Sequence, residues 1–380
     1  MPPCESWTNS ARAREAHVAE PMPRLVDLVI AVHDPRRPLA RAVRSALESG
    51  LDDEALRVTV VCHNIDEDEI AAALRPGLSE RVRLLTLRDG IRSPAGPFNH
   101  GIDAADARFV SIMGSDDSLD PGALAAWAGL AEQRRLDVVI PVQRHPSRAV
   151  IRTPPVRFRR FAPLDPLRDR LVYRTAPLGL ISTELMRRTG MRLTEGMPTG
   201  EDQEFSVQLT VSGAVIGYGW GLPSYVVGDD TADRTTHVRR TVDAEFEALS
   251  RLIDQPWFTA LAITVRRAVA VKHVRIHVFS FIARRFDADD WAVGERDALT
   301  DLVARLDRVA PGFQDHLSRA DVKALRALAD DAVPLARVRA LAAARRRFGT
   351  PSTLLSARLG ALYAPDAPLR FMAASALMSL

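Results

Sequence analysis

The feature that most constrains the fold of this chain is a regular change of hydrophobic period over its first 140 residues. Short continuous apolar runs rich in β-branched residues are typical of strands that are covered on both faces. Between these runs, apolar residues recur every three or four positions, which predicts amphipathic helices. The expected strands are 25–32, 56–62, 81–87, 108–113 and 136–142. Strands that alternate with helices predict a mostly parallel, doubly wound α/β sheet of Rossmann type.

The helices between these strands have boundary signals of their own. We expect a helix opened by Pro38, helices over 66–74 and 98–106, and a helix that has Asp120 as its N-cap and Pro121 at its first position. Residues 143–175 are rich in arginine and proline, which predicts loops or short strands that reach over the sheet. The remaining elements expected before residue 241 are strands at 176–182, 214–220 and 223–227 and helices at 183–189 and 199–213.

The domain organisation follows from length and from a second change of pattern. At 380 residues the chain exceeds the usual size of a single hydrophobic core. From about residue 241 onward the pattern is almost entirely helical and rich in alanine, leucine and arginine. We therefore expect a disordered leader over 1–24, an α/β domain over 25–240 and a mainly α-helical region over 241–380.

Composition excludes several classes of protein. The formal net charge is only +3, which is too small to predict a nucleic-acid-binding protein. Cys4 and Cys62 are the two cysteines, so a disulfide framework or a cysteine-rich zinc site is not expected. Residues 1–24 carry no apolar signal-peptide core, and no run of 18 apolar residues occurs in the chain. The expected location is the cytoplasm, with peripheral contact at the inner face of the membrane as an alternative.

Two adjacent aspartates follow the fourth expected strand, in the stretch "FVSIMGSDDSLDP". Ligands of doubly wound sheets bind outside the carboxyl ends of the strands, and Asp116 and Asp117 lie at such an end. A divalent cation would turn the repulsion of the two carboxylates into chelation, and hard oxygen ligands suit Mg²⁺ or Mn²⁺. The alternative is an ordinary strand-to-helix turn, where aspartate is common.

A second acidic pair, Glu201 and Asp202, stands at the start of an expected helix. A carboxylate at this position can act as a general base if it reaches a substrate hydroxyl. The alternative is structural: Thr199 and Asp202 have the spacing of a capping box, and acidic residues favour the first turn of a helix.

Residues 25–230 resemble the inverting glycosyltransferases of family 2, which have the GT-A fold. Four fragments carry the resemblance, in the family's order. They are "VDLVIAVHDPRRPLARAVRSAL" at the first strand and helix, "NHGIDAADARFV" at 99–110, "MGSDDSLDPGAL" at 113–124 and "GEDQEF" at 200–205. Each fragment is weak alone, but four of them in this order and at plausible spacings form a strong signal.

The resemblance implies transfer of a sugar from a nucleoside diphosphate donor, with a UDP-sugar favoured, to an acceptor hydroxyl with inversion. The acceptor would be a glycan or a lipid-linked molecule in cell-envelope or exopolysaccharide synthesis. Asp202 matches the catalytic base, with Glu201 in support, and Asp116 matches the metal-binding aspartate of the D-x-D motif. Asp117 and His237 are further candidate metal ligands. The candidate donor-binding residues are Val32, His33, Asp34, Asn64, Arg92, Asn99 and Ser115.

This chain also departs from the family pattern. Gly114 stands where the first aspartate of D-x-D is usual. The stretch "CHNID" replaces an acidic segment that reads the nucleotide base, so Asn64 or Asp66 is the candidate substitute. Phe98 replaces an arginine, and Arg92 is the nearby candidate for a phosphate-binding charge. These departures support an alternative from another class, a non-catalytic scaffold that kept the fold. A sugar-phosphate nucleotidyltransferase is disfavoured because the loop after the first strand has no glycine.

The C-terminal region contains a basic amphipathic stretch. Residues 255–286 hold six Lys/Arg and no Asp or Glu, with apolar residues at helical spacing. Such a helix can lie on an anionic membrane surface or form the packed face of a helical subdomain or of a homo-oligomer. Both interpretations stay open at the level of the sequence.

Overall fold

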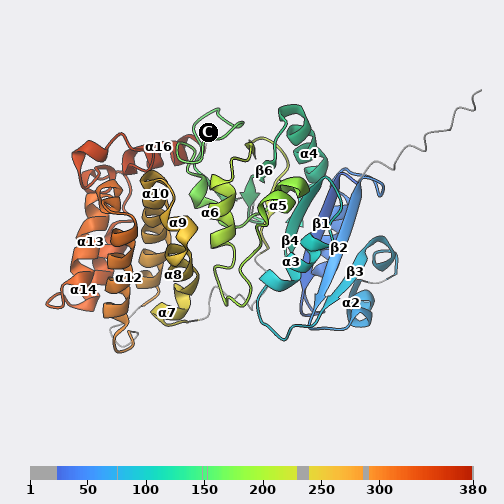
Figure 1. Ribbon diagram of the computed structural model, residues 1–380, viewed down its shortest axis with the longest axis horizontal. Helices are drawn as coiled ribbons and strands as arrows, with labels where there is room; N and C mark the ends of the chain where they lie inside the picture. Colours follow the sequence, from blue (N-terminus) through green and yellow to red (C-terminus); the bar gives the residue numbers. More distant parts are fainter. Residues whose placement is uncertain are drawn as a thin grey trace, which may run out of the picture.

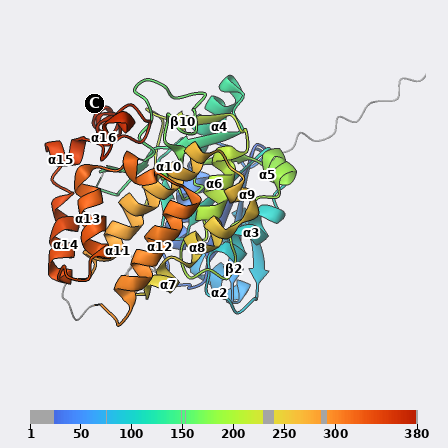
Figure 2. The ribbon, with the colours of Figure 1, turned by 60° about the vertical axis from the view of Figure 1, so that its left-hand side comes forward.

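The computed structural model describes residues 24–378 apart from residues 75, 148, 152, 229–238 and 286–290. The described part consists of a twisted sheet with helices on both faces and a group of C-terminal helices beside it (Figure 1). Seen from the second direction, α6, α8 and α10 lie between the sheet and the outer C-terminal helices (Figure 2). This arrangement brings the helical region directly against the α/β part of the chain.

Within the described residues, seven strands form the central sheet in the order β10-β6-β9-β4-β1-β2-β3. Their bounds are Val26–Val32 (β1), Leu56–His63 (β2), Arg83–Leu87 (β3), Phe109–Gly114 (β4), Val138–Pro141 (β6), Leu180–Ser182 (β9) and Ile216–Gly219 (β10). Neighbouring strands are parallel, except that β9 runs antiparallel to both β4 and β6. The predicted mostly parallel α/β sheet is therefore confirmed.

The helices of the α/β part cover the sheet on its two faces. One face carries α1 (Leu39–Leu47), α2 (Glu67–Leu74) and α4 (Ala123–Arg134). The other carries α3 (Ala95–Asp103), α5 (Thr183–Thr189) and α6 (Gln203–Val211). Leu28 and Ile30 of β1 belong to the first core, whereas Val29 between them belongs to the second. This alternation explains why β1 is apolar at successive positions.

A small second sheet crosses the end of the central one. Its described strands, in spatial order, are Ser118–Leu119 (β5), Tyr225–Val226 (β11), Gln143–Arg144 (β7) and Val150–Ile151 (β8). β11 pairs with β5, so a segment more than 100 residues downstream lies beside the turn that follows β4. This pairing determines the surroundings of the two adjacent aspartates.

Three helix starts differ from those expected. α4 begins at Ala123 with Gly122 as its N-cap, so the prediction of Asp120 as the cap is wrong. The carboxylate of Asp120 instead accepts hydrogen bonds from Arg144 and from the backbone N–H of Ser224, which stabilises the small sheet. α3 begins and ends three residues earlier than expected, and α6 begins at Gln203 rather than at residue 199.

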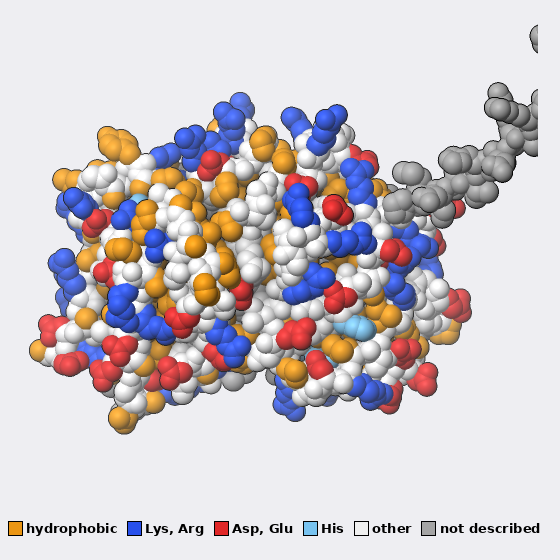
Figure 3. All heavy atoms as spheres, viewed as in Figure 1, with side chains coloured by type: hydrophobic (Ala, Val, Ile, Leu, Met, Phe, Trp, Pro, Cys, Tyr) orange, Lys and Arg blue, Asp and Glu red, His pale blue; other side chains and the backbone are white. Residues whose placement is uncertain are grey.

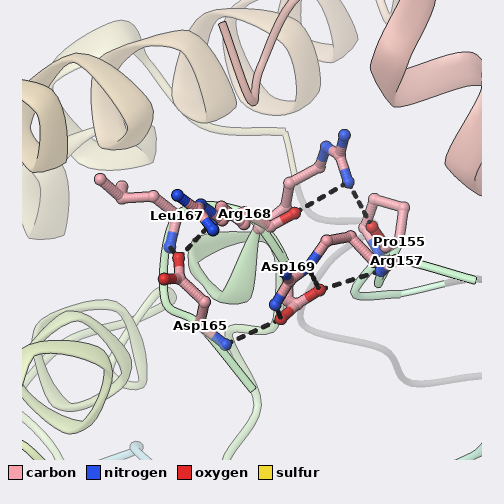
Figure 4. A network of polar contacts seen from close by, with 7 residues as sticks. Pro155, Arg157, Asp165, Leu167, Arg168 and Asp169 are labelled. Carbon is pink, nitrogen blue, oxygen red and sulfur yellow. Dashed lines mark hydrogen bonds and ion pairs between the residues drawn. The ribbon is translucent and has the colours of Figure 1, made fainter. Parts of the chain in front are cut away.

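The segment 153–174, expected as loop, is held together by one buried carboxylate. Asp169 accepts hydrogen bonds from the backbone and side chain of Arg157 at 2.7–2.9 Å and from the backbone N–H of Asp165 at 2.7 Å (Figure 4). These bonds hold the pKa of Asp169 below its ordinary value although its burial acts in the opposite direction. A charge-assisted network of this kind orders a segment that has little regular secondary structure.

The C-terminal region is helical, as expected. Its main described elements are Val242–Glu245 (α7), Glu247–Asp254 (α8), Pro256–Thr259 (α9), Ile263–His273 (α10), the π-helical turn Val274–Val278 (η4), Phe279–Ala283 (α11), Glu295–Val309 (α12), Arg319–Ala329 (α13), Leu335–Ala344 (α14), Pro351–Leu354 (α15) and Pro368–Leu377 (α16). Their core also includes Val172, Tyr173 and Val207 of the α/β part. The two regions therefore share buried apolar surface.

The basic amphipathic stretch lies at the centre of this helical core. Val271, Val274, Val278 and Phe281 of α10, η4 and α11 are fully buried. The apolar stripe is thus used for packing inside the protein, in agreement with the packed-face alternative. No helix of the described residues combines the length and the apolar character that crossing a bilayer requires. On the face drawn in Figure 3, basic and acidic side chains both occur across the full width of the molecule.

Candidate active site

Polar side chains follow the four strands β4, β1, β2 and β3 at the point where each strand ends. They are Asp34 after β1, Asn64 after β2, Asp89 after β3, and Ser115 and Asp116 after β4. Because these strands are parallel neighbours, their carboxyl ends meet at one edge of the sheet. This carboxyl edge is where doubly wound sheets bind ligands.

The two adjacent aspartates at this edge have different surroundings. Asp117 is turned inward: its Oδ2 accepts a hydrogen bond from the Tyr225 hydroxyl at 2.5 Å, and its Oδ1 accepts one from the Gly228 N–H at 2.8 Å. Burial raises the pKa of Asp117 above its ordinary value, and the charge of Asp116 acts in the same direction. The carboxylate of Asp116 lies 3.3 Å from the guanidinium of Arg37 and is 16% exposed. Asp117 is thus held by hydrogen bonds inside the protein, whereas Asp116 remains partly exposed.

Gly114 lies in close contact with both of these carboxylates. A side-chain carbon at position 114 would lie 2.7 Å from Oδ2 of Asp117 and 3.1 Å from Oδ1 of Asp116. An aspartate, which the family motif has at this position, would therefore require the Asp117 carboxylate to move from the place where Tyr225 and Gly228 hold it. Among the described residues, no group of three His, Cys, Asp or Glu side chains is arranged to hold a metal ion. Asp116 offers one hard oxygen ligand beside the Ser115 hydroxyl, and His237 lies outside the described residues.

Two arginines from the start of α1 reach the same strand end. Arg37 donates from Nε to the Ser115 hydroxyl at 3.2 Å, and Arg41 donates to the backbone carbonyl of Asp116. Sequence reasoning assigned the phosphate-binding charge to Arg92, which is exposed in the loop between β3 and α3. The signal that could have found Arg37 and Arg41 is their position: "PRRPLAR" directly follows the carboxyl end of β1.

At the ends of β2 and β3, Asn64 is part of a hydrogen-bonded cluster. Asn64, which has a φ of 57°, accepts from the N–H groups of Asp89 and Gly90 and donates to Oδ1 of Asp89 at 3.1 Å. Nε2 of His63 lies 2.9 Å from the same Asp89 oxygen. Although partial burial acts the other way, hydrogen bonds from Ile91, His63 and Asn64 hold the pKa of Asp89 below its ordinary value. Asp89 was missed by the sequence analysis.

The other donor-binding candidates occupy varied positions. Val32 is buried at the end of β1, and His33 beside it is exposed. Asp34 accepts three hydrogen bonds from the side chain of Arg36 and one from its N–H, and these hold its pKa well below the ordinary range. Asn99 is buried in α3, where its amide bonds the backbone of Leu193 and the carboxylate of Glu195. The structure thus uses Asn99 to hold the segment before α6.

The second acidic pair immediately precedes α6. Asp202, and not Thr199, is the N-cap of this helix, so the capping box between Thr199 and Asp202 is not formed. The side chain of Asp202 makes no capping hydrogen bond either. Burial raises the pKa of Glu201 to about 7, and the neighbouring Asp202 charge adds to this effect. Burial also raises the pKa of Asp202, while the ammonium of Lys272 opposes the rise. Carboxylates whose pKa values are raised toward neutrality are suited to proton transfer.

A chain of contacts connects this pair to the carboxyl edge. The carbonyl of Glu201 accepts a hydrogen bond from Thr194 at 2.9 Å, and the adjacent Glu195 bonds Asn99 of α3. The first turn of α3 approaches the carboxyl edge, since a side chain at Gly96 would come within 2.8 Å of an Asp89 oxygen. The loop that carries Asp202 therefore packs beside a helix that starts at the carboxyl edge of the sheet.

The fold and these features define an α/β domain of GT-A type. Residues 27–192 match the family model "Glycosyl transferase family 2", so the predicted resemblance to this family is confirmed. The fold is similar to that of S. aureus TarS. The crystal structure of TarS 1–349 in complex with UDP-GlcNAc has a TM-score of 0.68 at 14% identity, covering 85% of this chain and 92% of that one.

Two further similarities complete the comparison. The complex of TarS 1–349 with UDP has a TM-score of 0.63 at 15% identity, over 85% of this chain and 91% of that chain. In sequence, the succinoglycan biosynthesis protein ExoO of Rhizobium meliloti (strain 1021) is 34% identical over 100 residues, which cover 26% of this chain. The match spans only 27% of the length of ExoO.

Proposed function

We propose that this protein transfers a sugar from a nucleoside diphosphate donor to an acceptor hydroxyl, with inversion, in the synthesis of a cell-envelope glycan or exopolysaccharide. The family 2 domain supports the reaction class. The bound UDP-GlcNAc and UDP of the TarS structures support a uridine nucleotide as donor, and ExoO supports a polysaccharide product. The observation that carries the proposal is the pair of raised-pKa carboxylates before α6, connected through α3 to a carboxyl edge equipped for phosphate.

The proposed donor lies along the carboxyl edge of β4, β1, β2 and β3. Its base lies next to Asn64 and Asp89, whose side chains are already oriented by mutual hydrogen bonds. Its diphosphate lies next to Ser115 and Asp116, where Arg37 and Arg41 provide positive charge. Guanidinium groups bind phosphate oxygens strongly, because they combine charge with several fixed N–H donors.

A divalent cation is compatible with this arrangement. Asp116 and the donor phosphates would hold Mg²⁺ or Mn²⁺, with Asp117 orienting the turn from behind. When bound, such a cation adds positive charge at the departing diphosphate. Arg37 and Arg41 lie at the same strand end and also provide positive charge. We therefore expect the cation to assist donor binding without being the sole source of positive charge there.

Asp202 acts as the proposed base. Its carboxylate takes the proton of the acceptor hydroxyl while the acceptor oxygen forms a bond to the anomeric carbon and the bond to the diphosphate breaks. Attack from the face opposite to the diphosphate inverts the configuration. The raised pKa of Asp202 makes it a better proton acceptor than an exposed aspartate. Burial and the charge of Asp202 raise the pKa of the neighbouring Glu201 to about 7, so Glu201 can support this proton transfer.

Calorimetric titration with UDP and UDP-GlcNAc, each with and without Mn²⁺, combined with a donor-consumption assay, tests the proposal. We expect both nucleotides to bind, Mn²⁺ to tighten binding, and UDP to be released from the sugar nucleotide in the presence of acceptor. A nucleotide-binding scaffold, the alternative that Gly114 favours, would bind UDP without releasing it from any donor. Metal-independent binding, or absence of binding to both nucleotides, would contradict the proposal and favour the non-catalytic scaffold.

A further inference from the structure

α10 of the helical region contacts the start of α6 next to the proposed base. The imidazole of His273 lies 3.0 Å from the side-chain amide of Gln203 through Nε2 and 2.8 Å from the Val269 carbonyl through Nδ1. Gln203 follows Asp202 directly, and Lys272 precedes His273. The bond between residues 203 and 273 therefore holds Asp202 and Lys272 near one another although they are 70 positions apart.

Lys272 is an unusual residue in this chain. Two of the 51 Lys/Arg residues are lysines, and they are Lys272 and Lys323. Lys323 is exposed on α13, whereas Lys272 is 3% exposed. A buried ammonium is costly unless an opposite charge faces it. A lysine places a compact charge at this point, where the larger, planar guanidinium of arginine would need more space and more hydrogen-bond acceptors.

The charges around Lys272 support an electrostatic pairing with Asp202. Burial lowers the pKa of Lys272 to about 8, and the carboxylate of Asp202 is the charge that opposes this fall. The other titratable groups at this junction are Glu201 next to Asp202, and His273 and His277, whose rings stack at 5.1 Å. Burial holds the pKa of both histidines well below the ordinary value, with Lys272 and, for His277, Arg284 acting in the same direction. The histidines are thus neutral at pH 7, and Lys272 is the cation that acts on Asp202.

We propose that Lys272 is a positioning residue of the active site, which keeps the Asp202 carboxylate ionised and oriented for proton transfer. The helical region is therefore part of the catalytic centre: α10 supplies the counter-charge, and His273 fixes its distance from α6 through Gln203. The inference rests on the proposed function for the role of Asp202, but the pairing itself is a property of the chain. It extends the site from the α/β part of the chain into the helical region.

A titration of the two lysine side chains tests the pairing without any activity. In protein grown with ¹³C-labelled lysine, two side-chain signals are expected, and loss of one in Lys323→Met assigns them. We expect Lys272 to titrate near pH 8. In Asp202→Asn the midpoint of Lys272 should fall by about one pH unit, because the opposing carboxylate charge is lost. An unchanged Lys272 midpoint in Asp202→Asn would overturn the proposal.

The activity test uses Lys272→Met, which keeps the length of the side chain and removes its charge, Lys272→Arg, and Lys323→Met as the matched control. We expect Lys272→Met to lower kcat at least about tenfold and to move the acidic limb of the pH profile upward by about one unit, because Asp202 then binds its proton more tightly. Lys272→Arg should restore the wild-type limb in part, and Lys323→Met should match the wild type. A Lys272→Met enzyme with the wild-type pH limb would also overturn the proposal.

The two measurements separate this inference from the proposed function. If no donor is consumed by the wild-type protein but the Lys272 midpoint responds to Asp202→Asn, the proposed function fails and the pairing stands. If transfer is observed but neither the midpoint nor the pH limb responds, the function stands and the role of Lys272 is refuted.

Discussion

The pKa values of carboxylates shift in opposite directions at the carboxyl edge of the sheet and at the junction of α6 with α10. At the edge, hydrogen bonds from neighbouring groups hold the pKa values of Asp34 and Asp89 below the ordinary range. At the junction, burial raises those of Glu201 and Asp202. Asp117 is the exception at the edge, because it is buried under Tyr225 and serves as support. The pKa values of the same residue types are therefore lowered at one place, which favours the ionised form, and raised at the other, which favours proton uptake.

The largest effect expected from this difference is that of Asp202→Asn. The amide keeps the shape of the side chain but cannot accept a proton, so transfer should fall by about a thousandfold. Binding of UDP should change by less than about twofold, because the proposed donor contacts lie at the other region. A donor-consumption assay and calorimetry on the same preparation measure the two quantities.

Asp243→Asn on α7 is the matched control, since Asp243 is exposed and is placed at neither region. It should behave as the wild type in both assays. Full turnover in Asp202→Asn would contradict the assignment of the base.

Asp116→Ala should have the converse effect. Loss of its carboxylate removes the partner of Arg37 and the hard oxygen ligand at the diphosphate position. We expect the affinity for UDP to fall about tenfold to a hundredfold and the response of binding to Mn²⁺ to disappear. Calorimetry with and without Mn²⁺ measures both changes. If the variant kept the wild-type affinity and the response to Mn²⁺, the proposed position of the diphosphate at this strand end would be contradicted.

Asp89→Asn sharpens the account of the nucleotide base. The substitution keeps the size of the side chain but removes the charge that His63 and Asn64 face. We expect UDP to bind about fivefold to tenfold more weakly, in the range of one lost charged hydrogen bond. The affinity for pyrophosphate should not change, because it does not reach this cluster. Equal weakening for UDP and pyrophosphate would show that Asp89 acts on the fold of the edge and not on the base.

The smallest effect concerns stability and pH. The pKa of Glu201 is raised from 4.5 to about 7 in the folded protein, so folding is favoured by its protonated form. Its contribution is therefore full below about pH 4.5 and is lost as the pH rises through about 7. Glu201→Gln removes this loss and should stabilise the protein at pH 8 by about 1–2 kcal/mol, with little change at pH 5. Thermal unfolding at both pH values measures it, and equal changes at the two would contradict the raised pKa.

The two regions also differ in how far the sequence could reveal them. The strands were predictable because each is a continuous apolar run, and the order of motifs placed Asp116 and Asp202 in the right class of fold. The start of α4 could not be predicted, because Asp120 accepts hydrogen bonds from Arg144 and Ser224. Ser224 is 104 residues away in the sequence. Local spacing favoured Asp120 as a cap, but tertiary contacts gave its carboxylate other partners.

Contacts between residues far apart in the sequence were missed for the same reason. Asn99 matched a family motif, yet its amide is taken by the segment 193–195, which no local pattern indicates. Lys272 stood within an apparently amphipathic stretch, and its proximity to Asp202 depends on the packing of α10 on α6. Asp89 stood next to a glycine in an ordinary turn signal, and its contact with Asn64, whose φ is 57°, joins the ends of two paired strands.

The most direct test of the central claim is a crystal structure of Asp202→Asn with UDP-GlcNAc. We predict that the uracil lies next to Asn64 and Asp89, that the diphosphate lies next to Asp116, and that the anomeric carbon faces residue 202. A cavity of about 740 Å³ lies at the opposite edge of the sheet and is lined in part by Arg24, Arg108 and Arg187. A nucleotide bound in that cavity, or a sugar directed away from residue 202, would contradict the account.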